Sequence, residues 1–175
     1  DLKMNIVGSE LIHKVAESAH MSDKVIKSLD EKSISLFDSL ISSFFEARHI
    51  WPNEYLRHLS MVMHTNAEHG NVIIIGRGGC FILKDKSFRV RIIAPEKARV
   101  EKVMRDRRMS ESDALAFVRK YDEYQIGFMK KYFNEDINDP KHYDMMVNTE
   151  KVGIESASES IKKAFLAWKS TWNRT

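Results

Sequence analysis

A glycine–arginine loop, Gly76-Arg77-Gly78-Gly79, directly follows the apolar run Val72-Ile73-Ile74-Ile75. Glycines allow the backbone to approach a ligand closely, and an arginine can donate two parallel hydrogen bonds to a phosphate. A helix that starts here would also direct backbone N–H groups at an anion. The loop is not a Walker A loop, because no Lys-Ser or Lys-Thr pair follows the glycines, and it is not GxGxxG. The spacing leaves two interpretations open: a phosphate-binding loop, or a tight turn with a solvent-facing arginine.

Basic residues follow along two adjoining predicted helices: Arg99, Arg105, Arg107, Arg108, Arg119 and Lys120. In a phosphoryl transferase, arginines above the site neutralise charge on the group that is being transferred. Arginines are also common on solvated helix faces, which is the more frequent role for any one of them. Arg99 and Arg105 are our catalytic candidates in this set.

The long helix predicted after Ser110 carries one polar residue in an otherwise apolar stripe. The stripe repeats at helical spacing and consists of Ala114, Val118, Tyr121, Gln125, Phe128 and Tyr132. Asp122 lies one turn before Gln125, so both side chains can reach the same point. Either the helix packs on a sheet with Gln125 at its edge, or Asp122 and Gln125 serve a catalytic site.

Other reactive side chains form no recognisable site. The seven histidines are scattered and lack Cys, Asp or Glu at metal-ligand spacing, so we predict no metal held by a cluster of protein ligands. Cys80 follows the glycine–arginine loop, where a buried small residue is expected. The order of residues does not indicate a Ser-His-Asp arrangement.

Alternating strands and helices are predicted to position these residues. Val72–Ile75 is an unbroken β-branched run, typical of a strand buried on both faces of a parallel sheet. Further strands are expected at 88–93 and 143–147, and helices at 96–107, from Ser110 to about 133, and at 154–172. The alternation predicts right-handed βαβ units and a parallel sheet, hence an α/β fold.

The first third of the chain is predicted to be helical. Apolar residues recur at helical spacing from Ser9 until Trp51-Pro52 breaks the pattern. Asn53 is then expected to cap a helix that ends at Gly70.

The composition is that of one globular domain with a mixed surface charge. The chain has 175 residues, of which 43% are hydrophobic, and a formal net charge of +3, which does not suggest a nucleic-acid partner. No apolar run approaches the roughly 18 residues needed to span a bilayer. The single Cys80 fits a reducing compartment. We therefore expect one domain over residues 1–175, in the cytoplasm, with no membrane or nucleic-acid partner.

The order of these motifs resembles the cytidylate kinase-like family of P-loop kinases. The resemblance rests on NVIIIGRGGCFIL, FRVRIIAPEKARVEKVMRDRRMSESDA, Lys120-x-Asp122 and DPKHYDMMVNTE, with SELIHKVAES upstream. It implies a five-stranded parallel β-sheet of the P-loop NTPase type (nucleoside monophosphate kinase-like) flanked by helices, with a helical front third and a helical lid at 96–133.

The same resemblance implies an activity and residue roles. The activity is transfer of the γ-phosphoryl group of ATP, with Mg²⁺, to a nucleoside monophosphate such as CMP or dCMP. Arg77 would hold the acceptor phosphate, with Gly76, Gly78 and Gly79 in its loop. Arg99 and the arginines after it would belong to the lid.

Two departures from the family pattern bear on activity. The family begins with a strand and a Walker A loop, neither of which is found in this sequence, and we expect the chain to be truncated. The family's lid helix carries Asp-x-x-Arg, whereas this chain reads Asp122-Glu123-Tyr124-Gln125. Glutamine cannot supply positive charge, and loss of such an arginine can lower the rate by orders of magnitude. Arg119 and Lys130 are the neighbours that could compensate.

Three hypotheses stay open at this point. The first is a nucleoside monophosphate kinase, and the second is a degenerate kinase fold that binds a nucleotide or a protein without transferring phosphate. The third is a helical interaction module, based on Phe37, Phe44, Phe45, Trp51, Met61 and Met63. Those six residues could equally form the core or the face of a homodimer.

Overall fold

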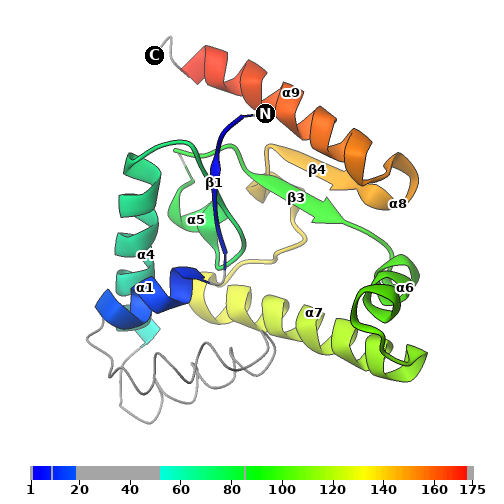
Figure 1. The fold of residues 1–175 in the computed structure, drawn as a ribbon. Helices are drawn as coiled ribbons and strands as arrows, with labels where there is room; N and C mark the ends of the chain where they lie inside the picture. The colour runs from blue at the N-terminus through cyan, green and yellow to red at the C-terminus, as the bar shows by residue number, and fades with distance from the viewer. Residues whose placement is uncertain (1, 9, 19–51, 85, 173–175) are drawn as a thin grey trace. The chain divides into compact units, whose positions relative to one another are not determined.

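The computed structural model of the protein describes residues 2–8, 10–18, 52–84 and 86–172. They form two compact units, Asp1–Leu83 (unit 1) and Lys84–Thr175 (unit 2), and each is described by itself. Each unit holds one pair of parallel strands (Figure 1). The parallel pairing confirms the predicted α/β class.

Unit 1 contains β1 (Asn5–Val7), α1 (Glu10–Ser18), α4 (Pro52–Glu68), β2 (Val72–Ile74) and α5 (Gly79–Ile82). β1 and β2 pair in parallel, with Asn5 opposite Val72 and Val7 opposite Ile74. Helices α1 and α4 pack against each other. They contribute the largest fully buried side chains among the described residues, which are Leu11, Val15, Leu59 and Met63. Apolar residues at helical spacing therefore make the core, as the sequence indicates.

Helix α4 begins one residue before the predicted cap at Asn53. Its first residue is Pro52, a position at which proline's missing N–H is not needed and its fixed φ suits the helix. The predicted end of α4 is confirmed. Gly70 has a left-handed φ of 69°, and its N–H donates to the carbonyl oxygen of Ala67 at 2.9 Å.

The prediction that the run Val72–Ile75 is buried on both faces is wrong. Ile73 and Ile75 are 44% and 59% exposed. Ile74, on the other face, lies against α5, with its Cγ2 3.5 Å from the point where a Cβ on Gly79 would be. A continuous β-branched run is buried on both sides only when helices cover both faces of its sheet. In the described part of the chain, the face of β2 that carries Ile74 is covered and the opposite face is not.

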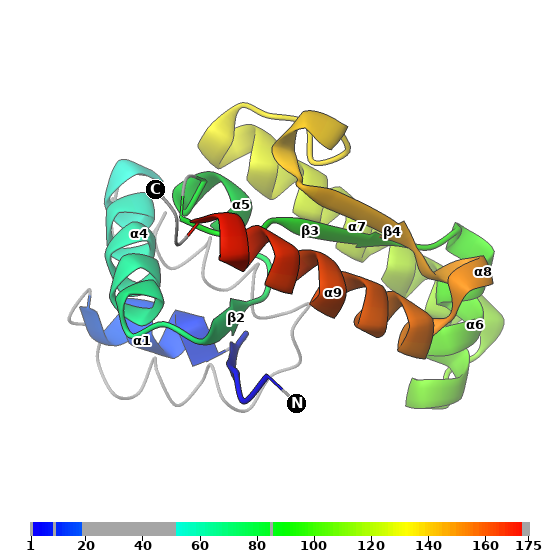
Figure 2. The same ribbon diagram turned by 90° about the horizontal axis from the view of Figure 1, so that it is seen from above.

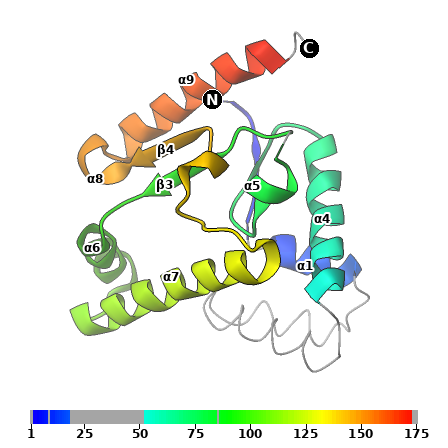
Figure 3. The ribbon, with the colours of Figure 1, turned by 180° about the vertical axis from the view of Figure 1, so that it is seen from behind.

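Unit 2 contains β3 (Val90–Ile93), α6 (Glu96–Arg107), α7 (Glu111–Phe133), a 3-10 turn (Pro140–His142), β4 (Met145–Asn148), α8 (Thr149–Val152) and α9 (Ile154–Trp172). β3 and β4 are parallel, with Val90 opposite Met145 and Ile93 opposite Asn148. Helices α7 and α9 lie on opposite sides of this sheet (Figures 1 and 3). α9 runs alongside both strands (Figure 2).

Alternation along the strand explains how the two faces of β3 are used. Phe88 contacts the rings of Phe165 and Trp168 on α9, at centroid distances of 6.2 and 5.8 Å. Successive side chains of an extended chain point to opposite faces, so Arg89 and Arg91 point away from α9. The α7 side of the sheet therefore receives Arg89 and Arg91 as well as the apolar Ile93 at the end of β3.

Helices α6 and α7 form a hairpin whose limits follow the local sequence. The Ser110 Oγ accepts a hydrogen bond from the Asp113 N–H at 3.2 Å and caps α7, which begins directly after Ser110 as predicted. The chain turns between the helices at Arg108, whose φ is 55°. The hairpin core consists of Val100, Ala114 and Val118, with Val103, Met104, Met109 and Leu115 packed around them.

The described residues form two two-stranded sheets, so a single five-stranded sheet of P-loop NTPase type stays a prediction, as does a single domain.

Four of the six residues behind the interaction-module hypothesis, and most of the helical first third, lie outside the described residues. Of the other two, Met63 is fully buried in the core and Met61 is exposed. Within the described part, no helix is long and apolar enough to cross a membrane.

Arg89 and Asp144 join the segments that lead into β3 and β4. The Arg89 Nε and Nη2 donate to the Asp144 carboxylate at 3.1 and 2.7 Å, and the Arg89 backbone N–H donates to it at 2.8 Å. The side-chain hydrogen bonds from Arg89 lower the pKa of Asp144 below its ordinary value. The carboxylate is therefore favoured in the folded state.

We expect Asp144→Asn to reduce the acid sensitivity of folding. Because the folded-state pKa of Asp144 is lowered, its stabilisation is complete above the unfolded-state pKa of about 3.9 and is lost as the pH falls through the lower folded value. Urea unfolding should show a larger loss of unfolding free energy between about pH 7 and about pH 3 for the wild type than for the variant. Glu159→Gln, an exposed carboxylate on α9, is the control. Equal losses in wild type and Asp144→Asn would contradict this role.

Candidate functional site

The glycine–arginine loop of unit 1 lies at the carboxyl end of β2, where ligands of α/β sheets bind. Gly76, Arg77 and Gly78 have successive left-handed φ values of 75°, 53° and 72°. The Gly79 N–H donates to the Gly76 carbonyl oxygen at 3.1 Å and closes the turn. This conformation is open to glycine but costs a residue with a side chain on the order of 1 kcal/mol. The loop thus holds Arg77 in a strained conformation.

The helix after this loop is a single turn. α5 has four residues, begins after Gly78 and has no side-chain cap. One turn of helix supplies little dipole, so an anion here would depend on Arg77 and on the backbone of the loop. Successive backbone N–H groups in tight turns do form anion-binding concavities. A phosphate bound here would therefore depend on the loop rather than on a helix end.

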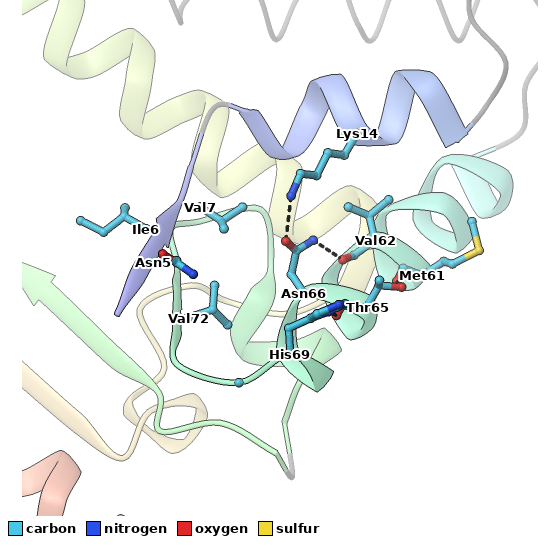
Figure 4. A pocket seen from close by; sticks show the side chains of 11 residues that line it. Asn5, Ile6, Val7, Lys14, Met61, Val62, Thr65, Asn66, His69 and Val72 are labelled. Carbon is cyan, nitrogen blue, oxygen red and sulfur yellow. Dashed lines mark hydrogen bonds between the residues drawn. The ribbon is translucent and has the colours of Figure 1, made fainter. Parts of the chain in front are cut away.

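A hollow of about 650 Å³ in unit 1 lies along β1 and α4 (Figure 4). Its lining includes Asn5, Ile6 and Val7 of β1 and Val72 of β2, and none of the residues of the glycine–arginine loop. Its polar groups are engaged with one another, since the Lys14 Nζ donates to the Asn66 Oδ1 at 2.9 Å, and the Asn66 Nδ2 donates to the Val62 carbonyl oxygen at 2.7 Å. It is separate from the glycine–arginine loop at the carboxyl end of β2.

Unit 2 brings Arg91, Arg99, Asp122 and Gln125 together, and we call them the arginine cluster. The Arg99 Nη1 and Nη2 donate to the two Asp122 oxygens at 2.6 and 2.8 Å, and its Nε donates to the Ala94 carbonyl oxygen at 3.1 Å. The hydrogen bonds to Asp122 raise the pKa of Arg99, which keeps it charged. Gln125 is half-buried one turn further along α7, and its Oε1 accepts from the Arg91 Nη1 at 3.4 Å.

The remaining arginines of α6 and α7 lie outside this cluster. The side chain of Arg105 is 74% exposed, and its Nε is 4.0 Å from the Asp106 Oδ1. It comes six residues after Arg99 and so projects from another side of α6. Arg119 donates to both Glu96 oxygens at 2.9 and 3.0 Å. The contacts therefore bring Arg99, Asp122 and Gln125 together and leave Arg105 apart from them, and the catalytic role of all four stays a prediction.

Arg91 is the member of the cluster that the sequence analysis missed. Arg119 and Lys130 were the neighbours that could compensate for Gln125. Arg119 is bound to Glu96, whereas Arg91 of β3 contacts Gln125. The available signal was Arg91 itself, an arginine between Val90 and Ile92 within the predicted strand FRVRII. A charged residue in the interior of a strand covered by a helix needs a partner or a ligand.

The described residues do not fit a metal ion held by protein ligands. Among them, no group of three or more His, Cys, Asp or Glu could hold one. Asp122, the carboxylate of the arginine cluster, already accepts both hydrogen bonds from Arg99. Mg²⁺ in nucleotide enzymes commonly depends on substrate phosphates and one or two carboxylates, so we assign no residue and no step to it.

Comparison with known proteins shows the family of this chain. Residues 1–151 match the cytidylate kinase-like family. Cytidylate kinases of Pyrococcus horikoshii and Thermococcus sibiricus are each 32% identical over 101 residues, which make up 56% of this chain and 51% of each relative. The chain thus spans about half the length of the curated relatives it matches.

A solved structure supports the fold alone. The crystal structure of an uncharacterized protein from Eubacterium ventriosum is similar with a TM-score of 0.62 and 20% identity, over 94% of this chain and 99% of that chain. Taken with the match over residues 1–151, the motifs and the parallel α/β architecture lead to one conclusion: this chain belongs to the cytidylate kinase-like family.

Proposed function

We propose that this chain acts in a nucleoside monophosphate kinase, which transfers the γ-phosphoryl group of ATP to CMP or dCMP in the cytoplasm. The observation that carries the proposal is the strained left-handed conformation of Arg77, between two left-handed glycines directly after β2. Unfavourable backbone conformations of this kind cluster at ligand-binding and catalytic sites. Membership of the cytidylate kinase-like family supports the same reaction class.

Arg77 and its loop would bind the acceptor. A guanidinium group can donate two parallel hydrogen bonds to a phosphate, which fixes both the position and the orientation of that group. Gly76 and Gly78 have no Cβ, so the backbone N–H groups of the loop can come close to the same phosphate. The loop would thereby position the acceptor nucleotide for the reaction. Positioning of the reactants, together with electrostatic stabilisation, is the main contribution of a protein to phosphoryl transfer.

Arg99 would neutralise charge on the phosphoryl group that ATP supplies when bound. Its two contacts with Asp122 and the third with Ala94 fix the guanidinium beside the residue that follows β3. A cation that is already held in place loses little conformational freedom when charge develops on the substrate, and this makes its stabilisation effective. Asp122 is thus a positioning residue for Arg99.

The direct test is phosphoryl transfer by the complete natural protein, because this chain covers about half of its curated relatives. ADP formation is measured with CMP, dCMP, UMP and AMP as acceptors. We expect the fastest turnover with CMP or dCMP. Absence of turnover with all four acceptors would reject the kinase activity.

A second candidate is a nucleotide-binding protein that transfers no phosphate. It is favoured by Gln125, which provides no positive charge from α7 and accepts a hydrogen bond from Arg91. This candidate predicts that CMP binding depends on Arg77 while no ADP forms with any acceptor. ATP-dependent formation of CDP would exclude it.

A further inference from the structure

Arg91 is a partly buried arginine whose guanidinium makes one long hydrogen bond. Among the described residues, its one hydrogen bond runs from Nη1 to the Gln125 Oε1 at 3.4 Å. That distance exceeds the 2.7–3.2 Å that is usual for N–H···O bonds. Its Nε is shielded from solvent and has no hydrogen-bond partner in the described part of the chain. Such atoms are rare in native proteins, and each requires an explanation.

Other arginines of unit 2 show what the guanidinium of Arg91 lacks. Arg89 places Nε and Nη2 on the two oxygens of Asp144, and Arg119 uses the same two atoms on Glu96. Arg99 uses its two Nη atoms on Asp122. Arg91 contacts Gln125 through Nη1, so the edge formed by Nε and Nη2 has no carboxylate in the described residues.

No carboxylate of the arginine cluster is available to the Nε–Nη2 edge of Arg91. Asp122 is its one carboxylate, and both oxygens accept from Arg99 at 2.6 and 2.8 Å. The cluster therefore combines two guanidinium groups with one carboxylate, and one positive charge is not compensated. A part-buried positive charge with two adjacent donors is the arrangement that binds two oxygens of one anion.

We propose that Arg91 binds a phosphate group of the nucleotide through its Nε–Nη2 edge, an inference that rests on the function proposed above. The ligand supplies the two acceptor oxygens that the chain does not, and the long contact with Gln125 is readily given up when the side chain turns toward them. Arg91 thereby provides, from β3, the positive charge that Gln125 cannot provide from α7. Arg91 and Arg99 contact side chains one turn apart on α7, Gln125 and Asp122, so one polyphosphate would be able to bind both guanidinium groups.

The test compares thermal unfolding of this chain with and without ATP, CMP or inorganic pyrophosphate. In Arg91→Met the side chain keeps its length but loses its donors. We expect this variant, without ligand, to unfold at a temperature no lower than the wild type, because a shielded donor without a partner has been removed. The rise in Tm with ATP should disappear, and the Kd for ATP should increase at least about tenfold, as expected when a charge-assisted hydrogen bond is lost.

Two further variants separate binding from folding. Arg91→Lys keeps the charge without the paired donors, and we expect an intermediate Kd for ATP. Arg119→Met removes an arginine whose corresponding edge is already filled by Glu96, and its Kd should stay within about twofold of the wild type, as expected for an exposed ion pair.

Three outcomes would overturn the inference. One is an Arg91→Met chain that is less stable without ligand yet keeps the full rise in Tm with ATP, since that indicates a structural role. Another is a wild-type chain whose Tm responds to neither nucleotide. The third is a response to pyrophosphate alone, which would assign the site to free phosphate anions.

The inference and the proposed kinase activity can fail separately. Nucleotide binding that depends on Arg91, in a complete protein that forms no ADP, rejects the kinase but retains this site. Normal turnover by an Arg91→Met enzyme with an unchanged KM for ATP rejects this site but retains the kinase.

Discussion

Arg77→Ala is expected to weaken the binding of CMP to this chain about 100-fold. Hydrogen bonds to charged groups contribute about 1.5–3 kcal/mol each, and tenfold in affinity corresponds to about 1.4 kcal/mol. Arg77 lies between two left-handed glycines at the carboxyl end of β2, where no other residue of the loop carries a charge. Alanine adopts a positive φ no more easily than arginine, so the substitution removes the guanidinium without relieving the backbone.

Calorimetric titration of CMP provides the measurement for Arg77. Arg77→Lys keeps the charge but loses the paired donors, so its Kd should fall between the wild type and Arg77→Ala. Arg57→Ala removes an exposed arginine of α4 in the same unit and should leave the Kd unchanged. An unchanged Kd in Arg77→Ala would show that the loop is a turn with a solvent-facing arginine. The proposed acceptor site would then be wrong.

Leu59→Ala is expected to lower the free energy of unfolding by about 2–5 kcal/mol, the range for a fully buried leucine that leaves a cavity. Leu59 is 0% exposed and lies on α4, which packs against α1. Because alanine favours helices, the loss must come from the core rather than from the helix itself. Unfolding in urea, followed by circular dichroism, measures it.

The matched control is Met61→Ala on the same helix. The side chain of Met61 is 51% exposed, and surface substitutions of this kind usually change stability by about 0.5 kcal/mol or less. Similar losses in both variants would contradict the assignment of Leu59 to the core and Met61 to the surface. The comparison also tests the one exposed residue that remains, within the described part of the chain, from the interaction-module hypothesis.

The sequence alone determined the features that depend on neighbouring residues. The limits of α6 and α9 and the cap of α7 were predictable because helix starts, stops and periodicity are set within a few residues. The position of the glycine–arginine loop at the end of β2 followed in the same way from a β-branched run that ends in glycine. Parallel pairing followed from the alternation of strands and helices.

Burial of a whole strand was not predictable from its own residues. Val72–Ile75 has the composition of a strand covered on both sides, yet Ile73 and Ile75 are exposed because one face of β2 lacks a covering helix in the described structure. Apolar β-branched composition reports what a strand can bury, whereas the tertiary structure decides what covers it.

The arginine cluster was the part that only the tertiary structure decided. The sequence supplied Arg99, Asp122 and Gln125 as candidates, but it ranked Arg105 with them and passed over Arg91. The contacts that bring these residues together join positions far apart in the sequence. Arg99 and Asp122 are 23 residues apart, and Arg91 and Gln125 are 34 residues apart. Which guanidinium meets which acceptor depends on how α6, α7 and β3 pack, because hydrogen bonds require the two groups within about 3 Å. No local pattern encodes that distance.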